Sequence, residues 1–210
     1  MIDSKIGKCV VRAATPDHAD EAAALIYETD QHVFGYWLKG GRNTVLRYFA
    51  EQWKLSKGLF SHALCIGVYD EDALIGIELG YDRKTKRQEG RAFFENAQQY
   101  LTGEQFNHFL KAMGYMPFLN PPVPRDAYYI QNLAVQRGIR KQGIGAKLIQ
   151  DAFDRAVRRG YRSCHLDVSG DNPAFHFYQR MGMDVLNEMR VPYLDERYNI
   201  PVHYRMVKML

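Results

Sequence analysis

The sequence predicts an α/β (α+β) fold, with helices on both faces of a mixed, mostly antiparallel sheet of about seven strands. Three observations support this prediction. An apolar strand, a basic glycine turn, an amphipathic helix and a second strand follow one another over residues 127–168. Two apolar runs joined by an acidic turn at residues 70–72 indicate a β-hairpin. Helical spacing of apolar residues occurs both before and after this hairpin. A chain of 210 residues can bury a core of this size, and we expect one domain over residues 1–210.

The first 81 residues are expected to form a strand, two helices and the hairpin, over residues 8–14, 15–34, 43–57, 62–69 and 73–81. Thr15 and Pro16 mark the start of the first helix, because Thr caps free amides and proline suits the first helical position. We expect this helix to end before Gly35. Gly58 is expected to stop the second helix, since glycine readily takes the conformation that closes a helix.

Residues 82–126 have the least regular pattern. Residues 83–87 are expected to form a charged loop, whereas residues 91–114 have helical spacing with many aromatic side chains. Four prolines between residues 117 and 124 then interrupt regular structure. We therefore expect a helical insertion at about residues 83–126, which could cover a pocket or form a homodimer face.

The rest of the chain has the strongest pattern. Its expected elements are a strand, a turn, a helix, a strand, a helix and two strands, over residues 127–136, 137–142, 143–159, 162–168, 172–181, 183–191 and 203–208. Apolar residues of the first of these helices recur on one face from Ile144 to Ala156. That helix is expected to pack on the sheet.

The turn at Arg140–Gly145 (RKQGIG) lies where a strand passes into a helix. Backbone amides at a helix N-terminus can hold a pyrophosphate, so the turn predicts a phosphorylated ligand. A Walker turn is excluded, because Ile144 and Gly145 stand where Lys and Ser or Thr are required. A dinucleotide fingerprint is excluded as well, because Leu148 stands where its third glycine is required.

The turn that remains resembles the acetyl-CoA site of the GNAT family of N-acetyltransferases. Leu133, Ala134 and Val135 precede the turn, as in that family. Asn172 and Tyr178, following the strand at 162–168, resemble the family's second motif. The order of the expected elements also resembles the family's topology from residue 8 onward, except at about 83–126.

The resemblance implies an acetyl-CoA-dependent N-acetyltransferase that transfers the acetyl group directly to a primary amine of a small molecule or protein. The cofactor-binding residues that it implies are Leu133, Ala134, Val135, Arg140, Lys141, Gln142, Gly143, Ile144, Gly145, Ala146, Asn172 and Phe175. Asn172 lies six residues before Tyr178, one fewer than is common in the family, and Asp171 occupies the usual place. Either Asn172 or Asp171 is therefore expected to contact the pantetheine arm.

Two catalytic residues are expected. Tyr178 matches the family position of the acid that protonates the departing thiolate, and the alternative is a Tyr that packs its helix on the sheet. An alkylamine with a pKa of about 10 must lose a proton before attack, yet residues 127–132 contain no carboxylate. Glu78 is the candidate base, because a carboxylate in an apolar strand is costly unless it is paired or functional. A salt-bridged or edge-exposed Glu78 is the alternative.

The acceptor pocket of the family is usually built from the first two helices and the loop between them. The corresponding segment here is acidic and aromatic, which suits a cationic amine. Tyr27, Glu28 and Gln131 are the expected substrate-binding residues. The alternative is a capped helix end that packs its aromatic side chains. The sequence leaves open whether the acceptor resembles a polyamine or an amino acid, or is a protein amine.

Composition limits the other partners. The net charge of +4 and pI of about 8.9 suit an anionic ligand without requiring nucleic acid. No apolar run approaches the roughly 18 residues of a membrane span, and the first residues lack the apolar stretch of a signal peptide. Three cysteines lie far apart in apolar runs. We expect a cytoplasmic enzyme without metal, membrane or nucleic-acid partner. The competing hypothesis is a CoA-binding regulatory or interaction module that kept the fold and lost catalysis.

Overall fold

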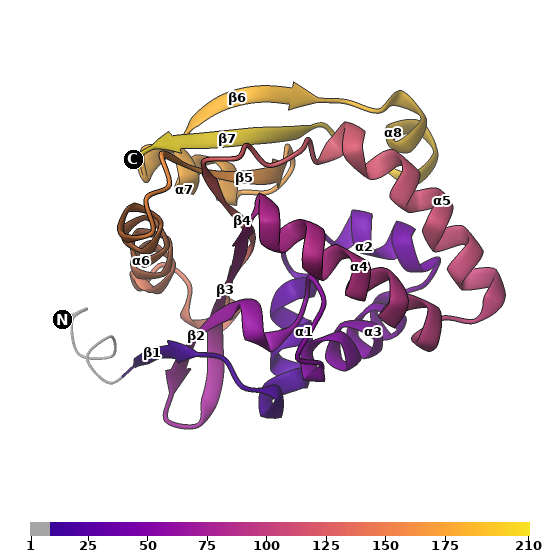
Figure 1. Cartoon of the computed structure of the whole chain (residues 1–210), viewed down its shortest axis with the longest axis horizontal. Coiled ribbons are helices and arrows are strands. Elements are labelled where there is room, and N and C mark those ends of the chain that lie inside the picture. The colour runs from indigo at the N-terminus through magenta and orange to yellow at the C-terminus, as the bar shows by residue number, and fades with distance from the viewer. Residues whose placement is uncertain (1–8) are drawn as a thin grey trace.

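The computed structural model describes residues 9–210 and arranges seven strands in one sheet, in the order β1-β2-β3-β4-β5-β7-β6 (Figure 1). The strands are β1 (Val10–Ala13), β2 (Cys65–Asp70), β3 (Ala73–Asp82), β4 (Ala127–Val135), β5 (Ser163–Ser169), β6 (Asp184–Met189) and β7 (His203–Met209). All neighbouring pairs are antiparallel except β4 and β5, which are parallel. The mixed, mostly antiparallel sheet expected from the sequence is confirmed.

Helices cover both faces of this sheet, with α6 on one side and α1 to α5 on the other (Figure 1). The helices are α1 (Ala19–Tyr27), α2 (Gln31–Leu38), α3 (Arg42–Lys54), α4 (Arg83–Tyr100), α5 (Gly103–Leu119), α6 (Ile144–Arg158), α7 (Ala174–Arg180) and α8 (Pro192–Tyr198). Side chains alternate between the faces of a strand. On β4, Ile130 therefore packs in the core beneath α6 and α7, whereas Tyr129 packs in the core beneath α1 to α5. None of the helices within residues 9–210 combines the length and apolar character needed to cross a membrane.

The helix expected over residues 15–34 is in fact two helices, so that prediction is wrong. A short 3-10 turn at Pro16–His18 leads into α1, which ends at Tyr27. Asp30 then starts α2, because its carboxylate accepts the Val33 amide at 3.1 Å. Gly35, expected as a stop, lies inside α2.

The prediction of a charged loop at residues 83–87 is also wrong, because these residues form the first turns of α4. Asp82 caps this helix by accepting the Thr85 amide at 2.7 Å. The charged side chains lie mostly on its exposed side, a pattern that a helix tolerates as well as a loop does. The paired α5 begins with a Thr102–Gln105 capping box and continues through Pro117.

Aromatic side chains join this helical pair to the rest of the core. Phe93 of α4 contacts Phe60 at 5.5 Å and Phe109 of α5 at 5.6 Å between ring centroids. Phe93 and Phe109 are buried, whereas Phe94 and Phe118 are exposed. Much of the aromatic density noted in the sequence is therefore buried within this chain.

From β4 to the C-terminus the expected elements are observed within about two residues, the usual scatter of element boundaries. One helix, α8, was not expected. It begins with Pro192 at its first position. At the other end of the chain, β1 was expected from residue 8, and Lys8 lies outside the described residues.

Candidate active site at the splay between strands

The parallel strands β4 and β5 pair only over their first halves. Their pairing ends at Ile130 and Leu166. Beyond this point β4 continues beside β3 as far as Val135, and β5 continues beside β7. The register of β3 against β4 shifts at the same place, leaving Gln131 as the extra residue of a β-bulge. A V-shaped splay therefore opens between β4 and β5 directly after Ile130.

The side of β4 that faces away from β3 directs backbone groups into this splay. The Gln136 amide donates to Ile75 on β3 at 2.9 Å. In a trans peptide the Val135 carbonyl must then point the opposite way, into the splay. Leu133 has the same orientation, because alternate residues of a strand direct their N–H and C=O groups to the same side. The splay thus offers an edge of hydrogen-bonding groups to an extended ligand.

The glycine turn forms the mouth of the splay. Lys141 and Gly143 have φ angles of 64° and 87°, and α6 begins directly afterwards. Glycine suits this left-handed conformation best. Among the described residues, the amides from Lys141 to Ala146 have no backbone acceptor, whereas the Lys147 amide donates to Gly143 at 3.0 Å. The free amides include those of Gln142, Ile144 and Gly145, so the turn can hold an anion.

The basic side chains of the turn contact a residue predicted for the acceptor. Arg140 donates through Nε to the Val135 carbonyl at 2.8 Å, which places its guanidinium beside the splay. Glu28, at the C-terminal end of α1, accepts from Arg137 at 2.7 Å and from Arg140 at 3.4 Å. The predicted acceptor residue Glu28 and the predicted cofactor residue Arg140 are thus in contact.

The second motif lies across the splay from the turn. A Cβ at Gly145 would lie 3.6 Å from Phe177 of α7 and 3.8 Å from Val135, an ordinary van der Waals distance. Phe175 packs against Tyr204 of β7, with ring centroids 5.1 Å apart. The two motifs, about 30 residues apart in sequence, therefore meet at the mouth of the splay.

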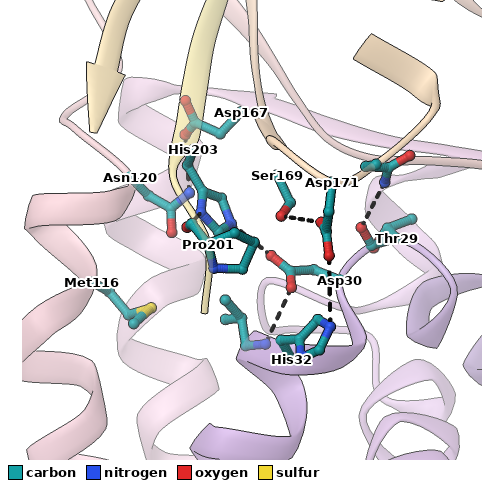
Figure 2. A network of polar contacts seen from close by, with 12 residues as sticks. Thr29, Asp30, His32, Met116, Asn120, Asp167, Ser169, Asp171, Pro201 and His203 are labelled. Atoms are coloured by element: carbon teal, nitrogen blue, oxygen red, sulfur yellow. Dashed lines mark hydrogen bonds and ion pairs between the residues drawn. The ribbon is translucent and has the colours of Figure 1, made fainter. Parts of the chain in front are cut away.

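Asn172 and Asp171 have different partners. Asn172 accepts the Ala174 amide at 2.9 Å and donates to the Thr29 carbonyl at 3.2 Å. Asp171 accepts from Ser169 at 2.6 Å and lies 3.6 Å from His32. Figure 2 shows Asp171 directed toward the α1–α2 turn. Both candidates for the pantetheine contact thus adjoin the same turn.

Tyr178 is a residue of α7, and its side chain lies in the core that α6 and α7 form with the sheet. Its side chain is buried, and burial raises the pKa of its hydroxyl. Within residues 9–210 the hydroxyl makes no side-chain hydrogen bond, in contrast to the paired hydroxyls of Tyr128 and Tyr129. A phenol that stays protonated at neutral pH has the state required of a proton donor.

Glu78 lies on the α6 face of β3 and is fully buried. Arg155 of α6 donates to its Oε2, and the Tyr128 hydroxyl donates to its Oε1 at 3.0 Å. Burial raises the pKa of Glu78 to about 7, although the charge of Arg155 opposes this shift. These contacts match the salt-bridged alternative for Glu78 rather than the catalytic one.

On the sheet face opposite to Glu78, beside the splay, lie polar residues that the sequence did not lead us to expect. Asp167 of β5 accepts from Arg205 through both carboxylate oxygens and from Tyr129 at 2.9 Å. It also accepts from Asn120 at 3.0 Å (Figure 2). Asp167 and Arg205 each leave only 2% of the side chain exposed. The sequence does contain a signal for this pair. Asp167 and Arg205 each lie in an apolar strand, where a charged side chain is costly unless it is paired.

Hydrogen bonds hold the α1–α2 turn, residues 28–30, against this face of the sheet. Asn132 of β4 donates to the Thr29 hydroxyl at 2.8 Å, and His203 of β7 contacts Asp30 at 2.9 Å. Figure 2 shows Asp30 between His203 and the start of α2. The side-chain oxygen of Asn132 is buried without a hydrogen-bond partner in the described part of the chain. The turn therefore closes one side of the splay.

The remaining predicted acceptor residues flank this turn. The Arg42 guanidinium lies 5.7 Å from the centre of the Tyr27 ring. Gln131, at the bulge, donates to the Leu59 carbonyl at 3.4 Å. The structure thus places Tyr27 and Glu28 at the C-terminal end of α1, and Gln131 at the bulge of β4 beside Leu59. Among the described residues, no group of three or more His, Cys, Asp or Glu side chains is placed to hold a metal ion.

Known proteins match this chain over the region that forms the splay. The sequence profile of the acetyltransferase (GNAT) family matches residues 78–183, half of the chain. An N-acetyltransferase from Staphylococcus aureus Mu50 has 16% identity and a TM-score of 0.68, over 95% of this chain and 100% of that one. The polyamine N-acetyltransferase of Drosophila melanogaster has 16% identity and a TM-score of 0.59, over 96% and 100%.

A third solved structure is the paia N-acetyltransferase from Thermoplasma acidophilum in complex with coenzyme A. It has 13% identity and a TM-score of 0.52, over 96% of this chain and 99% of that one. At such identities the likeness is one of fold, and it extends over nearly the whole chain. The profile match includes β4, the glycine turn, β5 and α7, which together form the splay. The chain therefore belongs to the acetyltransferase (GNAT) family and is an acyltransferase.

Proposed function

We propose that this protein transfers the acetyl group of acetyl-CoA to a primary amine. The observation that carries the proposal is the splay between β4 and β5 with a ring of free amides at its mouth. A splay of this shape admits an extended arm along β4, and the amides suit its phosphate end. In this proposal residues 1–210 form one catalytic domain, and residues 83–126 are an insertion in it.

The chain's own groups account for cofactor binding. The residues proposed to hold the pyrophosphate are Arg140, Lys141, Gln142, Gly143, Ile144, Gly145 and Ala146. The residues proposed to line the pantetheine arm are Leu133, Ala134, Val135, Asn172 and Phe175. Acetyl-CoA supplies an activated thioester. Because Leu133 and Val135 direct backbone groups into the splay, they can pair with the amides of the arm.

Tyr178 is proposed to donate the proton that the departing thiolate takes up. Support comes from its hydroxyl, which makes no side-chain hydrogen bond within residues 9–210 and is protonated at neutral pH, as phenols ordinarily are. Glu78 is not given the base role in this proposal, because Arg155 and Tyr128 occupy both of its oxygens. The kinetics and unfolding of E78Q distinguish a catalytic base from a structural ion pair at this position.

The proposed acceptor is a small cationic amine that enters beside the α1–α2 turn. Tyr27 offers an aromatic face, Glu28 a carboxylate and Gln131 a carboxamide at the bulge, and such groups recognise an ammonium ion and its N–H donors. The fold relative from Drosophila melanogaster is a polyamine N-acetyltransferase that forms N-acetylagmatine, which supports testing such amines first. A protein amine is the other acceptor to test.

A thiol-release assay tests the function. Purified protein is mixed with acetyl-CoA and, in turn, agmatine, spermidine, an aromatic amine, amino acids and a lysine peptide. We expect amine-dependent release of CoA with at least one small cationic amine, together with the acetylated product by mass spectrometry. Release at the rate of the amine-free blank with every acceptor would contradict the proposal.

A CoA-binding module without catalysis is the second candidate. The ion pair of Glu78 and the engagement of Glu28 by Arg137 favour it, because the predicted base and the predicted acceptor carboxylate are both already paired. Calorimetry separates the candidates when it is combined with the amine panel. Tight CoA binding with no amine-dependent turnover supports the module, whereas tight binding with turnover supports the enzyme.

A further inference from the structure

A basic hollow lies where α4 begins. Its walls are Arg83, Lys84, Arg87 and Gln88 of α4 together with Arg125 from the loop before β4, and its volume is about 550 Å³. The helix and the loop are about 40 residues apart in sequence. Tertiary structure therefore gathers four cations into one concave surface.

This hollow is separate from the acetyl-CoA splay. Asp82, directly before Arg83, pairs with Tyr128 at the beginning of β4. The glycine turn follows Val135 at the other end of the same strand. Seven residues of strand at about 3.3 Å each span roughly 23 Å. The hollow and the proposed pyrophosphate site thus lie at opposite ends of β4.

The four cations of the hollow are not neutralised by the described part of the chain. Arg83, Lys84, Arg87 and Arg125 form neither salt bridges nor side-chain hydrogen bonds within residues 9–210. The adjacent carboxylate of Asp82 is already used, since it accepts from the Thr85 amide and the Tyr161 hydroxyl. Burial raises the pKa of Asp82, but the hydrogen bonds from Thr85 and Tyr161, with a smaller effect of the Lys84 charge, lower it more, so the net pKa is lowered.

Like charges that converge without a partner repel one another. Arg83 and Arg87 are four residues apart on α4, so they lie on the same face of the helix, where like charges destabilise it. Arg125 adds a third guanidinium from the facing loop. A bound anion removes this repulsion, and a concave site with several cations holds it better than a single exposed lysine does.

We propose that the hollow binds a compact polyanion carrying two or more phosphoryl groups. Guanidinium groups pair with phosphate oxygens in a bidentate manner, and three of the five wall residues are arginines. None of the five is aromatic, so a nucleobase could stack only on the guanidinium planes, the same groups that phosphoryl oxygens engage here. Recognition therefore rests on charge and on the spacing of the phosphoryl groups.

Titration calorimetry with inorganic pyrophosphate tests the proposal. The protein is first saturated with CoA, so that the glycine turn does not compete for the probe. We expect one pyrophosphate per chain, with binding that weakens as salt is raised. In the double variant R87Q/R125Q the dissociation constant should rise at least tenfold, while the affinity for CoA stays unchanged.

The matched control is R47Q/K111Q, which removes two exposed cations outside the hollow and gives the same net charge. It should bind pyrophosphate as the unmodified protein does. Absence of binding to the unmodified protein, or equal weakening in both double variants, would overturn the proposal. Neither double variant alters the glycine turn, so the difference between them reports on the hollow even if the protein fails to bind CoA.

Discussion

Tyr128 and Tyr129 are neighbours on β4 and donate hydrogen bonds to carboxylates on opposite faces of the sheet. Tyr128 donates to Glu78 at 3.0 Å, and Tyr129 donates to Asp167 at 2.9 Å. Each carboxylate is also paired with an arginine. The two tyrosines directly precede Ile130, where β4 and β5 stop pairing. A buried ion pair therefore lies on each side of the sheet at the base of the splay.

The ion pair beneath α6 predicts a large stability loss for R155M. Removing one partner of a buried pair leaves an uncompensated charge and costs about 3–5 kcal/mol of unfolding free energy. Glu78 keeps only the hydrogen bond from Tyr128 in this variant. Urea unfolding at pH 7 measures the loss. The double variant E78L/R155M, which replaces the pair by apolar side chains, should recover most of it. A loss in R155M below about 0.5 kcal/mol would contradict the role of the pair.

The same pair predicts how stability depends on pH. Burial raises the pKa of Glu78 to about 7 from its ordinary value of 4.5, and loss of Arg155 raises it further. The folded protein then holds a proton that the unfolded chain releases, so the unfolding free energy of R155M falls as pH rises above 4.5. The deficit of R155M relative to the unmodified protein should therefore be smaller at pH 5 than at pH 8. Unfolding curves at the two pH values check this sign.

The contacts of Glu78 also predict the kinetics of E78Q. A general base contributes about 10²–10⁴-fold to the rate. Because Arg155 and Tyr128 occupy both oxygens of Glu78, we expect E78Q to keep its kcat with the best amine and to lose unfolding free energy instead. Steady-state rates and urea unfolding of the same preparation give both quantities. A kcat reduced a hundredfold or more in a folded E78Q protein would assign the base role to Glu78.

Tyr178 is predicted to act in the transfer step. Y178F removes the hydroxyl and keeps the ring that packs beneath α6 and α7, so folding and the affinity for acetyl-CoA should change little. We expect kcat to fall about 10²-fold or more, because a positioned proton donor is lost. Steady-state kinetics combined with CoA calorimetry checks the prediction. An unchanged kcat would give Tyr178 a packing role only.

His203 is predicted to make the α1–α2 turn sensitive to pH. Its Nδ1 contacts the Pro201 carbonyl at 2.9 Å and its Nε2 contacts Asp30. Both partners are acceptors, so both ring nitrogens carry protons when both bonds form. Burial lowers the pKa of His203, but the hydrogen bond and charge of Asp30 raise it more, and the net pKa is raised.

Because the folded pKa of His203 is raised, its stabilising contribution is complete below about pH 6.5 and is lost as pH rises through the folded value. H203Q should lose about 1.5–3 kcal/mol of unfolding free energy at pH 6, the usual worth of a hydrogen bond to a charged group. The loss should shrink at pH 9. Thermal unfolding from pH 5 to pH 9 measures it, with H176Q as the control for an exposed histidine. Equal losses at both ends of this range would contradict the titration of His203.

Local patterns predicted one part of this site well. The strand, glycine turn and amphipathic helix from Ala127 to Arg158 were predictable because each depends on short-range spacing: alternation in the strand, glycine at the left-handed position Gly143 and one apolar face in α6. The splay itself depends on tertiary structure. Local spacing cannot specify where two parallel strands part.

Other features depend on distant partners and could not be predicted. The break between α1 and α2 is held by His203, which lies 173 residues from Asp30 in sequence. Likewise the pairing of Asp167 with Arg205 joins two strands 38 residues apart. In the second case charged side chains in apolar strands indicated a cost, and in both cases only the fold identified the partner.

The contact of Glu28 with Arg140 gives the last prediction. Glu28 pairs with Arg137 at 2.7 Å and with Arg140 at 3.4 Å. Arg140 begins the turn proposed to bind the pyrophosphate, and Arg137 lies three residues before it. The carboxylate therefore competes with the phosphate for the same charges. Since partly exposed ion pairs contribute about 0.2–1 kcal/mol, E28Q should tighten acetyl-CoA binding by up to about fivefold. Calorimetry with CoA measures this change. Because Glu28 is also proposed to bind the amine, E28Q should raise the KM for the amine as well, and an unchanged CoA affinity would contradict the competition with phosphate. The charge-preserving variant E28D should stay close to the unmodified protein in CoA affinity, because it keeps the competing carboxylate.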